Sequence, residues 1–206
     1  MKKFLFILLS LIVVSQLSAQ DFKFIQGISL SRYAIEPDVF VDALGDEYRY
    51  DINNVKGFII GTGIELALAS NISTEIDALF YQKGSIIVLP LPPAPYLEWN
   101  YTLTVFSFPV LLKIRPLDEP PVYILCGGEF SFVASHKSND KYITDVTKDI
   151  DYGVVAGGGF EIKMKNNSLF FEIRYHLGLK NITKNWTLHD SVKTNSIAFI
   201  IAFKVG

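Results

Sequence analysis

Apolar and charged side chains alternate along this chain from about residue 55 to the C-terminus. Between Phe171 and Leu177, every second residue is large and apolar, and the residues between them are Glu172, Arg174 and His176. A period of two is typical of β-strands, because successive side chains of a strand point to opposite faces of the sheet. The pattern therefore predicts strands that have one apolar face and one ionisable face.

Eight strands are expected, at residues 22–31, 56–69, 71–83, 101–115, 121–134, 151–164, 168–180 and 193–205. Ten strand residues at the usual tilt cover about 25 Å, which is the height of the apolar band of an outer-membrane barrel. The connections alternate between short turns, at 70–71, 116–120 and 165–167, and long polar loops, at 32–55, 84–100, 135–150 and 181–192. Such alternation predicts an all-β fold, an eight-stranded antiparallel up-and-down transmembrane β-barrel with turns in the periplasm and loops outside.

The period of two also assigns the side chains of each strand to an outward and an inward face. The outward face carries no charge, and its aromatic residues gather toward both strand ends, as in interfacial girdles. The inward face holds five bases, six acids and one histidine, which are predicted to form a polar network in the lumen: Lys23, Glu65, Glu75, Asp77, Lys113, Glu129, Glu161, Lys163, Glu172, Arg174, His176 and Lys204. Pro109 lacks an N–H group for the ladder, so a β-bulge is expected at this residue.

Residues 1–20 are predicted to be a cleaved signal peptide rather than a membrane helix. Two lysines precede a short apolar stretch, which ends in the small-residue sequence Ser18-Ala19-Gln20. Residues 21–206 then form one domain, the barrel. Without the two lysines, the formal charge changes from −2 to about −4, and this acidic balance argues against a nucleic-acid partner. Cys126 is the only cysteine, which excludes an internal disulfide, and it is interpreted as a small apolar residue on a strand.

Five segments between residues 55 and 205 carry a family likeness: Lys56-Gly57-Phe58 through Glu65-Leu66, Ile72-Ser73 through Tyr81-Gln82-Lys83-Gly84, Phe108-Pro109-Val110-Leu111-Leu112-Lys113, Asp151-Tyr152-Gly153 through Gly159-Phe160-Glu161, and Glu172-Ile173-Arg174-Tyr175-His176-Leu177-Gly178-Leu179. In order and spacing, these segments resemble the PorT-like outer-membrane β-barrel proteins of Bacteroidetes, a family of small eight-stranded barrels. The resemblance implies the barrel fold and an outer-membrane location. It also suggests a link to protein secretion, the process with which named members of the family are associated.

The chain departs from this family at two places. Ser107 stands two residues before the proline, where members often have an acid, and the C-terminus ends on Gly206 rather than on an aromatic residue. The second departure affects the signal that the outer-membrane assembly machinery recognises.

His176 suggests one catalytic hypothesis. A histidine oriented by Glu172, with Ser196 or Ser29 as the nucleophile, is the arrangement found in small barrels that deacylate lipid A. That reaction requires the serine and the histidine on the lipid-facing surface, whereas His176 is predicted to face the lumen. A structural role in the polar network is therefore favoured, and no catalytic residue is predicted.

No cofactor or metal site is predicted. Gly157-Gly158-Gly159 is not followed by a helix pattern, so it is interpreted as strand glycine rather than as a phosphate-binding loop. His136 and His189 have no acidic or thiol partner at ligand spacing. The acidic loop 36–51 is interpreted as solvated, with a divalent-cation or basic-partner site as the weaker alternative. The proline-rich segment 89–96 is interpreted as a loop kept out of strand pairing, with an apolar partner surface as its alternative.

The favoured function is a non-enzymatic barrel of the bacterial outer membrane that acts as an anchor or interaction module through its extracellular loops. The expected partners are outer-membrane lipid and lipopolysaccharide, the outer-membrane assembly machinery, and a protein at the loops. Three alternatives stay open. A narrow pore is disfavoured because the interior of an eight-stranded barrel is just wide enough for side chains. The others are a lipid-modifying enzyme and a soluble lipocalin-like ligand binder, which would need its apolar side chains to face inward.

Overall fold

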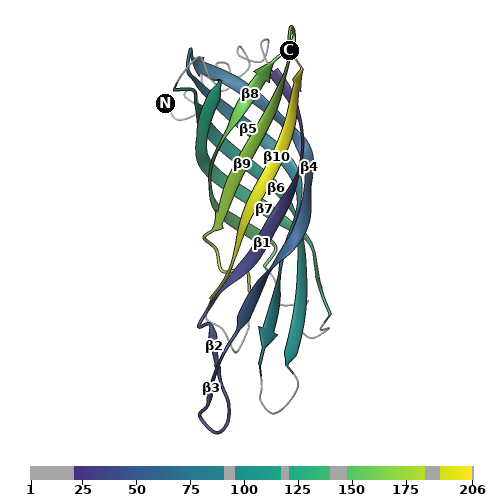
Figure 1. Ribbon diagram of the computed structural model, residues 1–206, viewed down its shortest axis with the longest axis vertical. Helices are drawn as coiled ribbons and strands as arrows, with labels where there is room; N and C mark the ends of the chain where they lie inside the picture. The colour runs from purple at the N-terminus through teal and green to yellow at the C-terminus, as the bar shows by residue number, and fades with distance from the viewer. Residues whose placement is uncertain (1–20, 91–95, 117–120, 140–147, 184–190, 206) are drawn as a thin grey trace, which may run out of the picture.

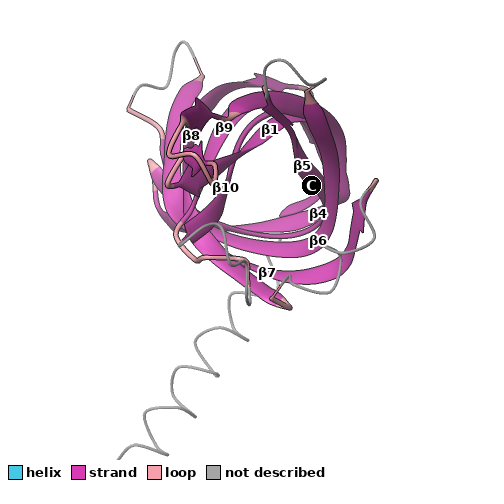
Figure 2. Ribbon diagram, turned by 90° about the horizontal axis from the view of Figure 1, so that it is seen from below, coloured by secondary structure: helices cyan, strands magenta, loops and turns pink. Residues whose placement is uncertain are grey.

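The computed structural model describes residues 21–90, 96–116, 121–139, 148–183 and 191–205. Eight strands form a closed antiparallel barrel: β1 (Asp21–Glu36), β4 (Asp51–Ala69), β5 (Ile72–Leu89), β6 (Leu97–Ile114), β7 (Val122–Ser138), β8 (Ile150–Lys163), β9 (Asn167–Gly178) and β10 (Ser191–Val205). Each pairs with the next barrel strand along the chain, and β10 pairs with β1 to close the ring seen in Figure 2. The predicted eight-stranded up-and-down barrel is confirmed. The expected signal peptide lies outside the described residues.

The outer wall of the barrel is apolar because most outward residues of the eight strands are aliphatic or aromatic side chains. Ile28, Ile60 and Ile173 are 61%, 57% and 56% exposed. Aromatic rings run across neighbouring strands in this wall, where Phe80 lies 5.6 Å from Phe58 and 5.5 Å from Phe106 between ring centroids. Among the described residues, no helix is long and apolar enough to cross a membrane.

Five strands run at least four residues farther than the alternation pattern predicted. Residues 32–36, 51–55, 84–89, 97–100 and 135–138 were expected to lie in loops, but they belong to β1, β4, β5, β6 and β7. These residues form the lower part of the barrel in Figure 1, opposite the end at which Ser70 and Asn71 form a tight turn. We call residues 32–55, 84–90 and 96–102 the loop-end extension, and the opposite end of the barrel the turn end.

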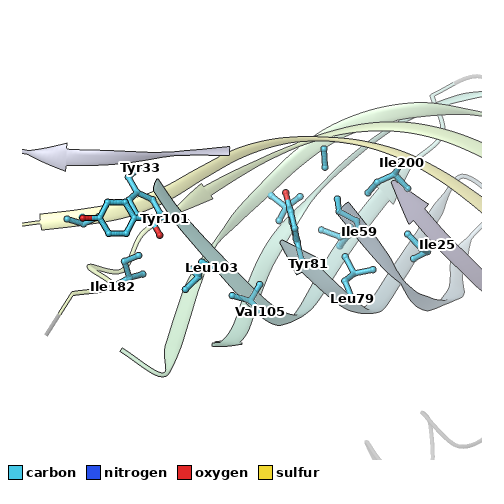
Figure 3. Close-up of a cluster of buried hydrophobic side chains, with 14 of the residues drawn as sticks. Ile25, Tyr33, Ile59, Leu79, Tyr81, Tyr101, Leu103, Val105, Ile182 and Ile200 are labelled. Carbon is cyan, nitrogen blue, oxygen red and sulfur yellow. The ribbon is translucent and has the colours of Figure 1, made fainter. Parts of the chain in front are cut away.

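The interior of the loop-end extension is apolar and continues the buried apolar cluster of the barrel. Its buried side chains share an inward orientation: Tyr33, Ile35, Tyr50, Ile87, Leu89 and Tyr101, with Leu103, Ile182 and Val192 packed beside them. Figure 3 shows Tyr33 and Tyr101 next to one another, with ring centroids 5.8 Å apart. Burial raises the pKa of the Tyr50 phenol. The apolar run Ile86-Ile87-Val88-Leu89, with three β-branched residues, was the signal that this segment continues as strand.

The acidic loop between β1 and β4 forms a small hairpin of β2 (Val39–Val41) and β3 (Glu47–Arg49). The Asp42 carboxylate closes the turn of this hairpin, because it accepts hydrogen bonds from the backbone N–H groups of Leu44 and Asp46, each at 2.9 Å. Asp38 lies 3.7 Å from Arg49. The hairpin forms the lower tip of the molecule in Figure 1.

The expectation of a bulge at Pro109 was wrong. Pro109 lies opposite Glu129 of β7 in an unbroken register, and the pairing with β5 passes from Val110 to Ser107 without a shift. The register shifts lie elsewhere, between β4 and β5 near residues 54–59 and 67–69, and between β6 and β7 at Thr104 and Val105. A missing N–H group therefore interrupts one ladder at this position without adding a residue to the strand.

Hydrogen exchange tests the extended strands directly. If residues 32–36 and 84–89 are strands over an apolar core, their amide protons exchange far more slowly than those of residues 43–46 at the hairpin tip, because local opening of the extension costs free energy. The measurement is amide exchange by mass spectrometry on the protein in lipid bilayers. Exchange of both segments as fast as the hairpin tip would contradict the described strand ends.

Candidate functional site

The centre of the lumen is occupied by a buried guanidinium that contacts three carboxylates. Arg174, on β9, is fully buried. Its Nη1 donates to Asp77 Oδ2 at 2.6 Å, its Nη2 to Glu75 Oε1 at 2.7 Å, and its Nε to Glu172 Oε2 at 2.7 Å. The planar guanidinium is suited to this arrangement because its donors point in several fixed directions.

Two buried lysines complete the charge of this central cluster. Lys23 Nζ donates to Glu75 Oε2 at 2.7 Å and lies 3.5 Å from Glu172 Oε1, while Lys113 Nζ also donates to Glu75 and lies 3.6 Å from Glu172. Each ammonium group covers an aromatic ring, Lys23 that of Phe170 at 4.3 Å and Lys113 that of Tyr123 at 4.4 Å. Three cations thus face three carboxylates, so the central cluster is neutral in sum.

The central cluster connects strands from opposite sides of the barrel. Lys23 comes from β1, Glu75 from β5, Lys113 from β6 and Glu172 from β9, and the Tyr123 hydroxyl of β7 donates to Glu172 Oε1 at 2.7 Å. Buried charges require partners in this environment, since unpaired charge in a medium of low dielectric constant is costly. The contacts therefore fill the lumen and link five strands across it.

Two glycines provide the space that these charges occupy. A Cβ atom at Gly63 would lie 2.1 Å from Asp77 Oδ1, and one at Gly159 would lie 2.8 Å from the Tyr123 hydroxyl and 3.0 Å from Glu172 Cγ. Both glycines belong to the inward face, where a side chain would take the room that the charged groups need.

A second group of charges lies toward the turn end. Arg115 Nη2 donates to Glu65 Oε1 at 2.5 Å, and its Nη1 donates to the Ser73 hydroxyl at 3.0 Å. Glu161 lies 3.7 Å from Arg115 Nε and 4.0 Å from Lys204 Nζ. This group is less buried, and it covers the central cluster on the side of the turn end.

A third group lies between the central cluster and the loop-end core. Glu129 accepts from Lys83 Nζ at 2.7 Å and from the Ser131 hydroxyl at 3.0 Å, and it forms a hydrogen bond with His176 Nδ1. Next to it, the Thr194 hydroxyl donates to Asp151 Oδ2 at 2.8 Å. The lumen therefore changes from charged to apolar over a short distance, because Leu103 and Tyr101 follow on the loop side.

The residues of the catalytic hypothesis do not assemble as that hypothesis required. His176 faces the lumen and is bound by Glu129, not by Glu172. The Ser196 hydroxyl forms a 2.6 Å hydrogen bond with the Tyr81 hydroxyl, and the Ser29 hydroxyl donates to the Gln82 carbonyl at 2.9 Å. All three side chains are buried, so the lipid-facing surface does not carry them.

The predicted lumen network is brought together, with one exception and three additions. Glu65, Glu75, Asp77, Lys113, Glu129, Glu161, Glu172, Arg174 and His176 are all buried inside the barrel, together with Lys23. Lys163 was wrongly included, since it is exposed at the last position of β8, where the strand leaves the barrel wall. The prediction omitted Lys83, Arg115 and Asp151, although each lies an even number of residues from a predicted inward residue of its own strand.

The other singled-out residues have structural surroundings. Gly157, Gly158 and Gly159 lie within β8, as strand glycine. His136 lies on β7 with its ring 5.7 Å from that of Tyr101, while His189 and residues 91–95 of the proline-rich segment lie outside the described residues. Cys126 is exposed on the outer face of β7. In the described part of the chain, no three His, Cys, Asp or Glu side chains are arranged to hold a metal ion.

The family comparison agrees with this geometry. A family model described as the outer membrane protein beta-barrel domain matches residues 19–184. This chain belongs to the outer membrane protein beta-barrel family. The barrel is therefore a protein of the bacterial outer membrane. That its turn end lies in the periplasm and its loop-end extension outside the cell stays a prediction from the usual orientation of such barrels.

Solved structures of similar fold include three small outer-membrane barrels. Neisserial surface protein A (NspA) is 15% identical, with a TM-score of 0.46, over 89% of this chain and 96% of that chain. Ail, the attachment invasion locus protein of Yersinia pestis, is 11% identical, with a TM-score of 0.41, over 89% and 98%. The outer membrane protease OmpT from Escherichia coli is 11% identical, with a TM-score of 0.41, over 91% and 96%. Among curated proteins, no sequence matches this barrel.

Loss of the central guanidinium is predicted to be strongly destabilising. Arg174→Met leaves Glu75, Asp77 and Glu172 against two lysines, and breaking a buried ion pair on one side costs about 3–5 kcal/mol. The free energy of unfolding is measured by urea titration in lipid vesicles. Lys137→Met, an exposed lysine at the end of β7, serves as the control and changes stability by less than about 0.5 kcal/mol.

A second variant separates charge balance from lost contacts. Asp77→Asn added to Arg174→Met restores equal numbers of cations and carboxylates, so part of the lost stability returns. Equal stability of Arg174→Met and the Lys137→Met control would contradict the structural role of the network.

Proposed function

We propose that this outer-membrane barrel is a non-enzymatic anchor and interaction module that binds a protein partner through its loop-end extension. The observation that carries the proposal is that β1, β4, β5 and β6 continue past the apolar outer wall and enclose an apolar interior, which is continuous with the buried apolar side chains of the barrel. A loop that only connects two membrane strands needs no such interior. An ordered extension presents its outer surface in a fixed shape, which reduces the entropy lost on binding.

The tip of the extension offers residues suited to a protein contact. Val41 and Leu44 of the β2–β3 hairpin are 56% and 87% exposed, and Tyr96 and Leu97, between β5 and β6, are 64% and 46% exposed. Val41 and Leu44 stand among the acids of the hairpin. Exposed apolar and aromatic residues with a polar rim are typical of protein interfaces.

A pore is disfavoured by the contents of the lumen. Arg174, Tyr81, Tyr101, Lys23 and Lys113 are among the largest fully buried side chains, and the three charged ones fill the central cluster. The apolar core lies across the loop end of the same interior. A solute would have to displace paired charges and then a packed apolar layer.

An enzyme is disfavoured by the placement of the candidate residues. His176, Ser196 and Ser29 are buried in the lumen, where acyl chains of the membrane do not reach. The link to protein secretion that the PorT-like resemblance suggests stays a prediction, since it concerns a partner and not the barrel itself.

Site-specific photo-crosslinking on intact cells tests the proposal. A benzophenone side chain placed at Leu44 is expected to give a discrete crosslinked protein, because the hairpin tip is part of the binding surface. The matched control is the same side chain at Lys165, which is exposed in the turn between β8 and β9. No adduct at Leu44, Val41 or Tyr96, or equal adducts at Leu44 and Lys165, would overturn the proposal.

Planar-bilayer recording tests the filled lumen separately. The purified barrel is expected to give no steady single-channel steps, because the charged cluster and the apolar core both block the axis. Reproducible steps of one conductance, abolished by denaturing the barrel, would favour a pore instead.

Lipid analysis tests the enzyme alternative. Lipid A extracted from cells with and without the protein is expected to have the same mass distribution. A mass difference corresponding to a lost acyl chain, abolished by His176→Ala in a variant that still folds, would contradict the non-enzymatic proposal.

A further inference from the structure

Three cationic side chains gather on the outer face of the barrel, where β1 lies between β4 and β10. Leu30 of β1 pairs with Lys56 of β4, and Ala34 pairs with Lys193 of β10. Arg32 lies between these two positions on the same outward face. Residues on diagonal positions of neighbouring strands are about 7–8 Å apart, which long side chains span. Arg32, Lys56 and Lys193 therefore form one cluster, which we call the outer cation cluster.

The outer cation cluster lies at a defined level, directly beyond the apolar wall. On the outward face of β4, the apolar wall ends at Phe58, and the next outward residue toward the loop end is Lys56. On β1, the wall ends at Leu30, and the next outward residue is Arg32. Glu36, which lies opposite Ser191, is a diagonal neighbour of Lys193 and lines a hollow together with Arg32 and Asp38, whereas Asp51 lies at the far end of β4. Within the described residues, no ion pair involves any of the three cations, whereas Asp38 is paired with Arg49.

An apolar hollow of about 810 Å³ lies on the membrane side of this cluster. It runs across β4, β1, β10, β9 and β8, which are neighbours in the barrel, and Figure 1 shows β4, β1, β10 and β9 side by side. Two rows of outward residues bound it, one through Phe58, Ile28 and Phe199, the other through Ile60 and Ile201. At its far end Gly158 leaves the outer wall without a side chain.

One polar side chain faces into this hollow. Gln26 points outward from β1 between Ile60 and Ile201, and it is exposed. An amide group in hydrocarbon has no water to bind, so it gains from a hydrogen-bonding partner brought by a ligand. Gln26 lies six residues from Arg32 along β1, about 20 Å at the usual strand rise, so this partner is not the head of a lipid bound at Arg32.

We propose that the outer face of β4, β1 and β10 binds a phosphate-bearing glycolipid of the outer leaflet. Its phosphate groups contact Arg32, Lys56 and Lys193, because guanidinium and ammonium groups bind phosphate through charge-assisted hydrogen bonds. One acyl chain of the same lipid lies in the hollow, beside Ile28 and Phe58. This ligand class is inferred because a phosphate-bearing glycolipid combines anionic groups with acyl chains, and the three strands combine the outer cation cluster with an apolar hollow.

The two halves of the site contribute differently. Acyl chains of neighbouring lipids are as apolar as the wall itself, so the hollow contributes packing rather than transfer from water. The phosphate contacts therefore dominate the affinity, and the hollow distinguishes a seated lipid from the bulk lipids around it.

Native mass spectrometry of the full-length protein with bisphosphorylated lipid A tests this site. The wild-type barrel is expected to retain lipid A. The triple variant Arg32→Gln, Lys56→Gln, Lys193→Gln is expected to lower the retained fraction at least about tenfold. The matched control removes the same charge elsewhere, through Lys137→Gln, Lys163→Gln and Lys165→Gln, and is expected to bind as the wild type does. Heat-modifiable gel mobility confirms that each variant is folded.

Two further arms separate phosphate recognition from general lipid binding. Dephosphorylated lipid A with the same acyl chains is expected to bind the wild type as weakly as lipid A binds the triple variant. Ile28→Trp, at an outward position that is 61% exposed, fills the hollow and is expected to lower retention with the cation cluster intact. The proposed site would be contradicted if the triple variant retained lipid A as well as the wild type does, or if the wild type retained the dephosphorylated lipid equally well. Unchanged retention by Ile28→Trp would contradict the placement of the acyl chain in the hollow.

Discussion

Pairing of charge inside the barrel is the constraint on which the rest of this structure depends. A membrane wall admits only apolar side chains, so every ionisable residue of the spanning strands must point inward and find a partner there. Arg174 is the partner of three carboxylates at once, and Lys23 and Lys113 neutralise the two negative charges that remain. Because the partners come from five strands, the same contacts that neutralise the interior also fill it.

Where the strands leave the apolar band, the requirement is reversed, and the structure changes with it. Water surrounds the loop-end extension, so its interior becomes apolar, with Tyr33, Tyr101 and Ile87 buried, and its charges lie outside. One chain thus has an inverted core in the membrane and an ordinary core beyond it, joined at the level of Lys83 and Leu103. The boundary between them is also where the outer cation cluster lies, which places the proposed lipid and protein contacts on either side of the membrane surface.

Much of this arrangement follows from the period of two in the sequence. The alternation around Glu172 and Arg174 correctly placed both side chains in the lumen. The same alternation assigns Lys83 and Arg115 to the inward face, but both were omitted because they are the last residues of the predicted strands 71–83 and 101–115. Periodicity cannot show where a strand stops. Lys163 follows the inward parity but lies past the wall, and residues 32–36 continue a strand despite their polar neighbours because an apolar core covers them. The partners of each charge could not be predicted either, since the contact of His176 with Glu129 instead of Glu172 depends on strand order and register.

The most direct test moves one charge across the wall without altering composition. In the variant Arg174→Ile with Ile173→Arg, the arginine points to lipid and the isoleucine to the carboxylates, because adjacent strand residues face opposite ways. Folding is followed in lipid vesicles by heat-modifiable gel mobility and urea titration. The account predicts no folded, heat-modifiable species, since position 173 is 56% exposed on the outer wall and position 174 is fully buried. Folding with wild-type stability would contradict it.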